Sequence, residues 1–201
     1  MNSQSLFSSL PNLITLGRLV LVPLIMVMIS SQRWLEAFVI FVVAGISDGV
    51  DGFIAKSFNL RTVLGAYLDP LADKALLMSI FVALSIDGTL PAWISILVVF
   101  RDVIILGAVI VSWLIDLPLR IKPLLISKLN TTAQIGFAGT VLGAKAFDLP
   151  MAGWEPALLY IVAALTLASG WGYLALWINH MADSGGGGAN PPSGPASGHR
   201  A

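Results

Sequence analysis

Long apolar stretches alternate with short polar breaks along the chain, and this pattern predicts helices. Each apolar stretch has roughly the 20 residues that a helix needs to cross the hydrocarbon core of a bilayer. The predicted stretches cover residues 11–30, 34–55, 65–86, 91–115, 128–144 and 156–179. The expected fold is therefore an all-α integral membrane protein with six transmembrane helices.

The composition agrees with this expectation and excludes several kinds of site. Of the 201 residues, 57% are hydrophobic and 11% are charged, whereas a soluble domain has about 25% charged residues. The net charge is zero, so there is no electrostatic reason to expect a nucleic-acid partner. The chain has no cysteine, which excludes disulfides, a thiolate nucleophile and a zinc–thiolate centre.

The two ends of the chain differ from the apolar stretches between them. Residues 1–10 are polar and serine-rich, and we expect an interfacial N-terminal segment there. The first eleven residues contain no Lys or Arg, which is unusual for a cleaved signal peptide, so the first apolar stretch is expected to be retained. Residues 183–201 are rich in Gly, Pro and Ser and predict a disordered tail. This leaves one membrane domain over residues 11–182.

The basic residues predict how the helices are oriented in the membrane. Arg33 and Lys145 are the only basic residues in the first, third and fifth connections. The second and fourth connections contain more basic residues, namely Lys56, Arg61, Arg120, Lys122 and Lys128. Because cytoplasmic loops carry an excess of Lys and Arg, we expect these two connections and both termini in the cytoplasm.

Two pairs of aspartates flank the second connection. Asp48 and Asp51 are three residues apart, and Asp69 and Asp73 are four apart, so each pair lies on one face of a helix. If the second helix turns back beside the first, the four carboxylates meet. Each costs about 2.5–3.5 kcal/mol at membrane depth, or roughly 10 kcal/mol together. A divalent cation such as Mg²⁺ would compensate this cost and recruit phosphate.

The residues between the two pairs fit the same interpretation. Lys56 and Arg61 supply positive charge that phosphate oxygens would attract. Small residues, which let a ligand approach the backbone, occupy positions Gly49, Gly52, Ala55 and Gly65. The alternative is that these are helix-end aspartates and loop bases placed by capping and topology alone. The combination at these spacings favours a metal and phosphate site at the cytoplasmic side.

This combination resembles the signature of the CDP-alcohol phosphotransferases. The motif reads Asp48-x-x-Asp51-Gly52-x-x-Ala55-Lys56, then eight residues, then Gly65-x-x-x-Asp69-x-x-x-Asp73. The family usually has arginine where this chain has Lys56, a difference that keeps the charge and loses bidentate geometry. The resemblance implies that an alcohol attacks the lipid-linked phosphate of a CDP-alcohol and that CMP is released.

The resemblance also implies roles for individual residues. Asp48, Asp51 and Asp69 would bind two Mg²⁺ or Mn²⁺ ions. Asp73 would be the general base that deprotonates the acceptor hydroxyl, and it would also contact a metal ion. The first predicted helix begins with a family-like motif, Pro11-Asn12-x-x-Thr15-x-x-Arg18. The residues expected to contact CDP and phosphate are Asn12, Thr15 and Arg18 of this motif, together with Gly52, Ala55, Lys56, Arg61 and Gly65. For Arg18, the alternative is a snorkelling arginine near the interface, whose charged end reaches towards water.

A second polar region is expected to bind the acceptor alcohol. The residues are Arg101, Lys122, Lys128 and Gln134. For Arg101 the alternative is a structural buried ion pair, and for Lys128 it is an interfacial lysine followed by polar groups bonded within the helix. The stretch resembles CMP-forming cardiolipin synthases, whose acceptor is phosphatidylglycerol. Phosphatidylglycerophosphate synthases, which use glycerol 3-phosphate, tend to have a further lysine at the position of Asn130.

The expected reaction is therefore the transfer of a phosphatidyl group from CDP-diacylglycerol to phosphatidylglycerol, which gives cardiolipin and CMP. The first alternative is glycerol 3-phosphate as acceptor. A cation transporter is a more remote alternative, because intramembrane carboxylates also mark ion pathways. The family resemblance further implies a homodimer. We expect a bacterial inner membrane, with a mitochondrial inner membrane as the second choice.

Overall fold

The computed structural model describes residues 3–58, 63–114, 125–151 and 153–186. These residues form helices and no β-strand. The helices are α1 (Ser3–Ser30), α2 (Trp34–Phe58), α3 (Val63–Ile86), α4 (Ala92–Leu114), α5 (Leu125–Ala146) and α6 (Glu155–Gly186). The predicted all-α fold with six helices is confirmed.

The predicted boundaries differ from the structure mainly at the two ends of the chain. Helix α1 begins at Ser3 rather than at Pro11, because residues 3–10 contain no Gly or Pro that would end a helix. Helix α6 continues to Gly186, so the first residues of the predicted tail are helical. Its last described residues, Gly185 and Gly186, begin a run of four glycines, and each glycine in a helix costs about 1 kcal/mol relative to alanine. The remaining tail lies outside the described residues.

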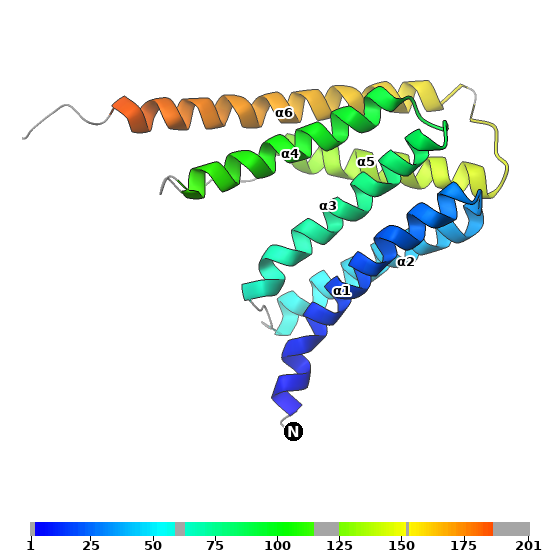
Figure 1. The fold of residues 1–201 in the computed structure, drawn as a ribbon, viewed down its shortest axis with the longest axis horizontal. Coiled ribbons are helices and arrows are strands. Elements are labelled where there is room, and N and C mark those ends of the chain that lie inside the picture. The colour runs from blue at the N-terminus through cyan, green and yellow to red at the C-terminus, as the bar shows by residue number, and fades with distance from the viewer. Residues whose placement is uncertain (1–2, 59–62, 115–124, 152, 187–201) are drawn as a thin grey trace, which may run out of the picture.

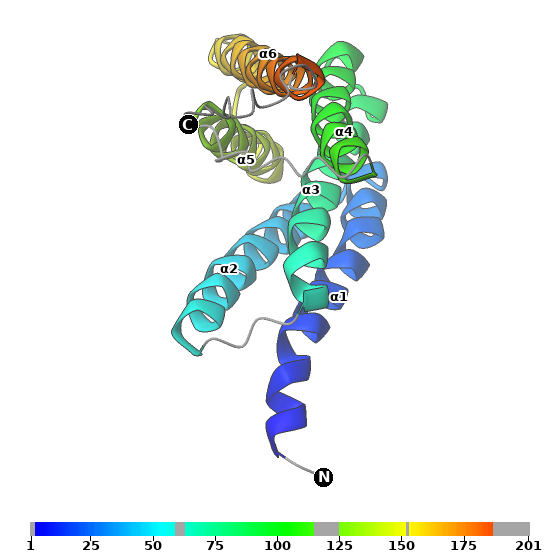
Figure 2. The ribbon, with the colours of Figure 1, turned by 90° about the vertical axis from the view of Figure 1, so that its left-hand side faces the viewer.

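The helices form two groups that meet at one end. Helix α1 packs against α2 and α3, α3 packs against α4, α5 packs against α2 and α3, and α6 packs against α4 and α5. The turns α1–α2, α3–α4 and α5–α6 lie at the same end, on the right in Figure 1. Towards the opposite end, α1–α3 diverge from α4–α6 (Figures 1 and 2).

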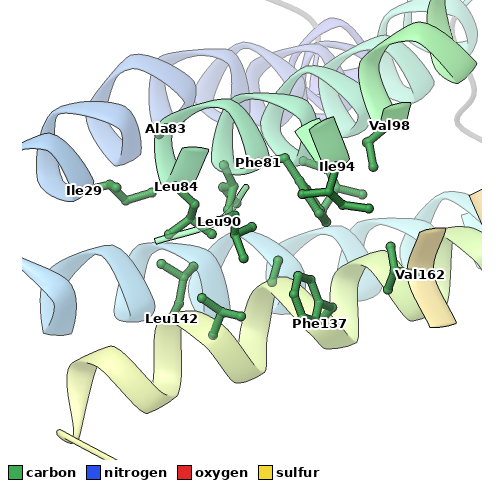
Figure 3. Close-up of a cluster of buried hydrophobic side chains, with 14 of the residues drawn as sticks. Ile29, Phe81, Ala83, Leu84, Leu90, Ile94, Val98, Phe137, Leu142 and Val162 are labelled. Carbon is green, nitrogen blue, oxygen red and sulfur yellow. The ribbon is translucent and has the colours of Figure 1, made fainter. Parts of the chain in front are cut away.

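The described hydrophobic core lies in the halves of the helices next to these turns. Phe81 and Leu84 of α3 are fully buried at its centre. They lie among Ile29 of α1, Ile94 of α4 and side chains of α5 and α6 (Figure 3). The ring centroids of Phe81 and Phe137 are 6.1 Å apart. The apolar contacts therefore join the two helix groups at the end where the turns lie.

Two glycines let α5 approach α2 closely. Gly139 and Gly143 are four residues apart and so lie on one face of α5. A Cβ atom at Gly139 would lie 3.0 Å from Cε1 of Phe41, and one at Gly143 would lie 3.3 Å from Cε2 of Phe38. Small residues at this spacing are a common means of close helix packing in membranes. The two phenylalanine rings thus occupy the space that larger side chains on α5 would need.

Side-chain contacts connect the turns to one another. Nε2 of Gln32, in the α1–α2 turn, donates to Oδ1 of Asp87 in the α3–α4 turn. The indole of Trp34 donates to Oε1 of Gln32 over 3.1 Å, and Nζ of Lys145 on α5 lies 5.0 Å from the centroid of the Trp34 ring. The chain turns at Asp87 and Gly88 between α3 and α4, and Gly88 has a φ of 81°. These contacts hold three helix ends together.

The outer surface is rich in apolar side chains. Several are more than half exposed, including Val20, Val43, Ile46, Ile96, Phe100, Ile161, Leu167 and Trp171. Soluble monomers rarely expose apolar patches of such extent. Among the described residues, one segment, Glu155–Asn179 with 25 residues, is both long and apolar enough to cross a membrane. Shorter apolar helical segments are Gly17–Ser30, Trp34–Ser47 and Lys74–Ile86.

Candidate functional site

The predicted metal ligands lie on two consecutive helices. Asp48 and Asp51 lie in the last turns of α2, and Asp69 and Asp73 lie in the first turns of α3. The helical backbone that the aspartate spacing requires is therefore confirmed for both pairs. The side chains of residues 48–58 and 63–73 lie outside the described residues. The convergence of the carboxylates, and the roles of the small residues and Lys56 between them, stay predictions.

The chemistry of this donor set fits a hard divalent cation. Four carboxylates supply oxygen ligands, which suit Mg²⁺ and Mn²⁺ better than softer metals. Among the side chains that the structure describes, no group of three His, Cys, Asp or Glu residues could hold a metal ion. The predicted aspartates at the ends of α2 and α3 therefore remain the candidate ligands.

Arg18 is the predicted phosphate contact that the structure describes. Its exposed fraction is 5%, and α1 packs along α3, which carries Asp69 and Asp73. A snorkelling arginine would keep its charged end exposed to water, so the burial of Arg18 argues against that alternative. The side chains of Asn12 and Thr15 lie outside the described part, as do Arg61 and Lys122.

A buried ionic cluster joins α3 to α4. Nζ of Lys74 lies 2.9 Å from Oδ1 of Asp102, and Nη1 of Arg101 also pairs with Oδ1 of Asp102. The side chains of Arg101 and Asp102 are each 4% exposed, whereas that of Lys74 is 32% exposed. One carboxylate oxygen therefore binds two cations, and the cluster carries a net positive charge.

Arg101 continues the cluster to the two remaining helices of its group. Its Nη2 donates to Oγ of Ser127 on α5 over 2.6 Å and to Oγ of Ser169 on α6. The guanidinium carbon lies 5.9 Å from the centroid of the Tyr173 ring. Arg101 was predicted to bind the acceptor, with a structural ion pair as the alternative. Its observed partners, Asp102 and the two serine hydroxyls, match the alternative of a structural ion pair. Among its nitrogens, the buried Nε has no hydrogen-bond partner.

A second polar cluster lies between α5 and α6. The hydroxyl oxygen of Thr166 lies 2.8 Å from Oδ1 of Asn130 and 2.7 Å from the carbonyl of Val162, and it can donate its proton to either. Nε2 of Gln134 donates to the same hydroxyl over 3.2 Å. Asn130 and Gln134 are fully buried. The predicted acceptor residue Gln134 therefore holds two helices together in this structure.

Lys128 is the fourth predicted acceptor residue, and the structure places it on the surface. Its side chain is exposed, and the neighbouring hydroxyls bond within the helix, since Thr131 donates to the carbonyl of Ser127 over 3.2 Å. This matches the alternative of an interfacial lysine followed by helix-bonded polar groups. The side chain of Arg101 on α4 reaches Ser127, the residue before Lys128.

Some members of these clusters were not among the predicted site residues. They are Lys74, Asp102, Ser169 and Thr166. A signal existed in the sequence, because Lys74 directly follows Asp73, and Thr166 and Ser169 are polar residues three apart in an otherwise apolar stretch. Polar groups inside membrane helices usually face a protein partner. The identity of that partner needed the structure.

Comparisons with known proteins agree with the signature. The human cardiolipin synthase (CMP-forming) is 31% identical over 82% of this chain and 60% of its own length. The chloroplastic CDP-diacylglycerol–glycerol-3-phosphate 3-phosphatidyltransferase 1 of Oryza sativa subsp. japonica is 35% identical over 83% of this chain and 56% of its own. The corresponding phosphatidyltransferase of Bacillus subtilis is 30% identical over 83% of this chain and 94% of its own.

The similarity to the family extends well beyond the signature residues. Residues 8–179 match the sequence profile described as CDP-alcohol phosphatidyltransferase, which covers all six helices except the two outermost ends. This match argues against the cation-transporter alternative. From the signature, the six-helix fold and this match, the chain belongs to the CDP-alcohol phosphatidyltransferase family.

Proposed function

We propose that the protein transfers the phosphatidyl group of CDP-diacylglycerol to a hydroxyl of phosphatidylglycerol, giving cardiolipin and CMP. The family match supports the CDP-linked donor, and the similarity to a CMP-forming cardiolipin synthase supports this acceptor. The observation that carries the proposal is the complete aspartate signature on two consecutive helices.

The proposed mechanism assigns the donor site to α2 and α3. Two Mg²⁺ or Mn²⁺ ions at Asp48, Asp51, Asp69 and Asp73 would neutralise the diphosphate charge. The Asp73 carboxylate accepts the proton of the attacking hydroxyl. The hydroxyl oxygen forms a new bond to the lipid-linked phosphorus. The bond from that phosphorus to the bridging oxygen breaks, and CMP leaves with that oxygen.

A membrane location follows from the same proposal. The exposed apolar side chains and the segment Glu155–Asn179 support helices in contact with lipid. An open apolar groove of about 430 Å³ between α3 and α4, lined in part by Ile86, Ile96 and Phe100, adds to this apolar surface. The basic second and fourth connections support a cytoplasmic site in six spans. A bacterial inner membrane is the first proposal and a mitochondrial inner membrane the second.

The choice of acceptor is argued from the residues in the first turns of α5. In the branch that uses glycerol 3-phosphate, a second lysine tends to occupy the position of Asn130. Here Asn130 is fully buried and bonded to Thr166, so this position adds no charge for a phosphate monoester. A phosphodiester acceptor such as phosphatidylglycerol needs less positive charge, which favours it.

Glycerol 3-phosphate stays the second candidate acceptor because two relatives carry it in their names. These are the phosphatidyltransferases of Oryza sativa and Bacillus subtilis. The latter is matched over nearly its whole length. The overall similarity therefore does not separate the two acceptors, and the choice between them depends on the α5 stretch.

A CMP-release assay on the purified protein in detergent tests both candidates. The protein is incubated with CDP-diacylglycerol and Mn²⁺ or Mg²⁺, with either phosphatidylglycerol or glycerol 3-phosphate, and the lipid product is identified by mass spectrometry. We expect turnover with phosphatidylglycerol. Turnover with glycerol 3-phosphate alone would overturn the acceptor and keep the donor chemistry. No CMP release with any alcohol would overturn the proposed function.

A further inference from the structure

We propose that Asp102 is a positioning residue that acts through Lys74. It fixes the rotation of α3 about its own axis, so that the helix face carrying Asp69 and Asp73 points towards the proposed metal site. The inference rests on the proposed function, because it assigns a role for Asp102 in the same reaction. Asp102 lies on α4 and belongs to neither aspartate pair of the signature.

The first step concerns the position of Lys74 on its helix. Lys74 follows Asp73 directly, and successive residues of an α-helix are separated by about 100° around the axis. A contact that holds Lys74 against α4 therefore also sets the direction in which Asp69 and Asp73 project from α3. Nζ of Lys74 makes this contact with Oδ1 of Asp102 over 2.9 Å.

The second step concerns what holds Asp102. Its Oδ1 also pairs with Arg101, whose other end binds Ser127 of α5 and Ser169 of α6. Both side chains of the Arg101–Asp102 pair are almost fully buried. The carboxylate is thereby fixed from three helices, and Lys74, which is one-third exposed, is the most accessible charged member of the cluster.

The third step is the effect of removing the charge of Asp102. Lys74 and Arg101 bind one carboxylate oxygen, so without that charge two cations would face each other and Lys74 would turn away. An atom 5–6 Å from a helix axis moves by about 1 Å when the helix rotates by roughly 10°. A misplacement of about 1 Å at a reacting group can lower a rate by about 100-fold.

The test compares matched variants of the full chain. Asp102→Asn removes the charge with little change in shape, Lys74→Met removes the partner, and Lys74→Arg keeps the ion pair. Ser95→Ala is the control, because Ser95 is also buried on α4 and its Oγ bonds the carbonyl of Phe81 on α3 over 2.6 Å. The control removes a contact between the same helices about two turns away.

We expect a loss in kcat that the control does not show. Asp102→Asn and Lys74→Met should each lower kcat for CMP release by about 10- to 100-fold. The double variant should be no slower than the slower single variant, because both changes remove one interaction. Lys74→Arg should retain most activity, and Ser95→Ala should lower Tm and leave kcat within about twofold.

A second readout is independent of turnover. Mn²⁺ with CDP should raise the Tm of the unmodified protein and of Ser95→Ala, and should raise it less in Asp102→Asn. A folded Asp102→Asn protein with unchanged kcat and an unchanged Tm rise would overturn the inference. If Asp102→Asn does not fold, Lys74→Met decides: a lowered kcat supports the role, and an unchanged kcat overturns it. An inactive unmodified protein overturns the proposed function itself and the inference with it.

Discussion

A methyl group added at Gly139 tests the close contact between α5 and α2. The added Cβ would lie 3.0 Å from Cε1 of Phe41 and 3.7 Å from its Cζ, whereas carbon atoms in contact prefer about 3.5–4.0 Å. The phenylalanine ring or the helix must therefore move by roughly half an ångström. Gly136, one turn earlier on α5, has nothing within 4 Å of the added atom and provides a matched control.

The two alanine variants are expected to differ in stability in a defined direction. Replacing a helical glycine with alanine gains about 1 kcal/mol, and at Gly136 nothing opposes this gain. At Gly139 the same gain is offset by overpacking, which costs about 1–3 kcal/mol. The difference between the variants is therefore about 1–3 kcal/mol. At about 2–4 °C per kcal/mol for a chain of this size, it corresponds to roughly 2–12 °C in Tm.

Thermal unfolding of the purified variants in one detergent, followed by tryptophan fluorescence, measures this difference. Gly136→Ala should have a Tm equal to or above that of the unmodified protein, and Gly139→Ala a lower one. Adding Phe41→Leu to Gly139→Ala should narrow the gap, because the ring atoms that clash are removed. If Gly139→Ala raised Tm as much as Gly136→Ala does, the close packing of α5 on α2 would be refuted.

Three further predictions concern the site and its support. Asp73→Asn should lower CMP release by about 10²- to 10⁴-fold, the usual contribution of a general base, in a protein that still folds; undiminished turnover would remove Asp73 as the base. Treatment with a chelator should stop CMP release and Mg²⁺ or Mn²⁺ should restore it, whereas continued turnover in the chelator would contradict the metal requirement. Thr166→Val leaves Oδ1 of Asn130 and Nε2 of Gln134 without their shared partner and should destabilise the protein by about 1–3 kcal/mol. A Tm equal to that of the unmodified protein would contradict this, and Thr166→Ser, which keeps the hydroxyl, is the control.

The helices in the middle of the chain could be predicted closely from the sequence. The bounds of α2, α3, α4 and α5 lie within three residues of the predicted stretches, because apolar runs there are separated by polar breaks such as Asp87-Gly88. At the chain ends this contrast is missing. The polar residues before Pro11 and after Asn179 lay outside the predicted apolar stretches, although they extend α1 and α6.

The site could be predicted in part. The aspartate spacing predicted two helical segments, and the structure has helical backbone at both. The partners of the buried polar groups were not predictable in the same way. Asp102 and Lys74 are 28 residues apart, and Arg101 and Ser169 are 68 apart. Such pairs depend on the order and rotation of packed helices, which the hydropathy of each helix does not determine.

The contacts among the turns at Gln32, Asp87 and Lys145 have a consequence for the sidedness of the proposed reaction. They close one end of the bundle with interactions inside the protein, whereas the aspartates belong to the opposite end of α2 and α3. A reaction at that end would take CDP-diacylglycerol and phosphatidylglycerol from the same leaflet. It would release water-soluble CMP into the compartment that this leaflet faces. In sealed vesicles with a single protein orientation, new lipid would then accumulate first in that leaflet. The opposite leaflet would receive it only as fast as lipids cross the bilayer.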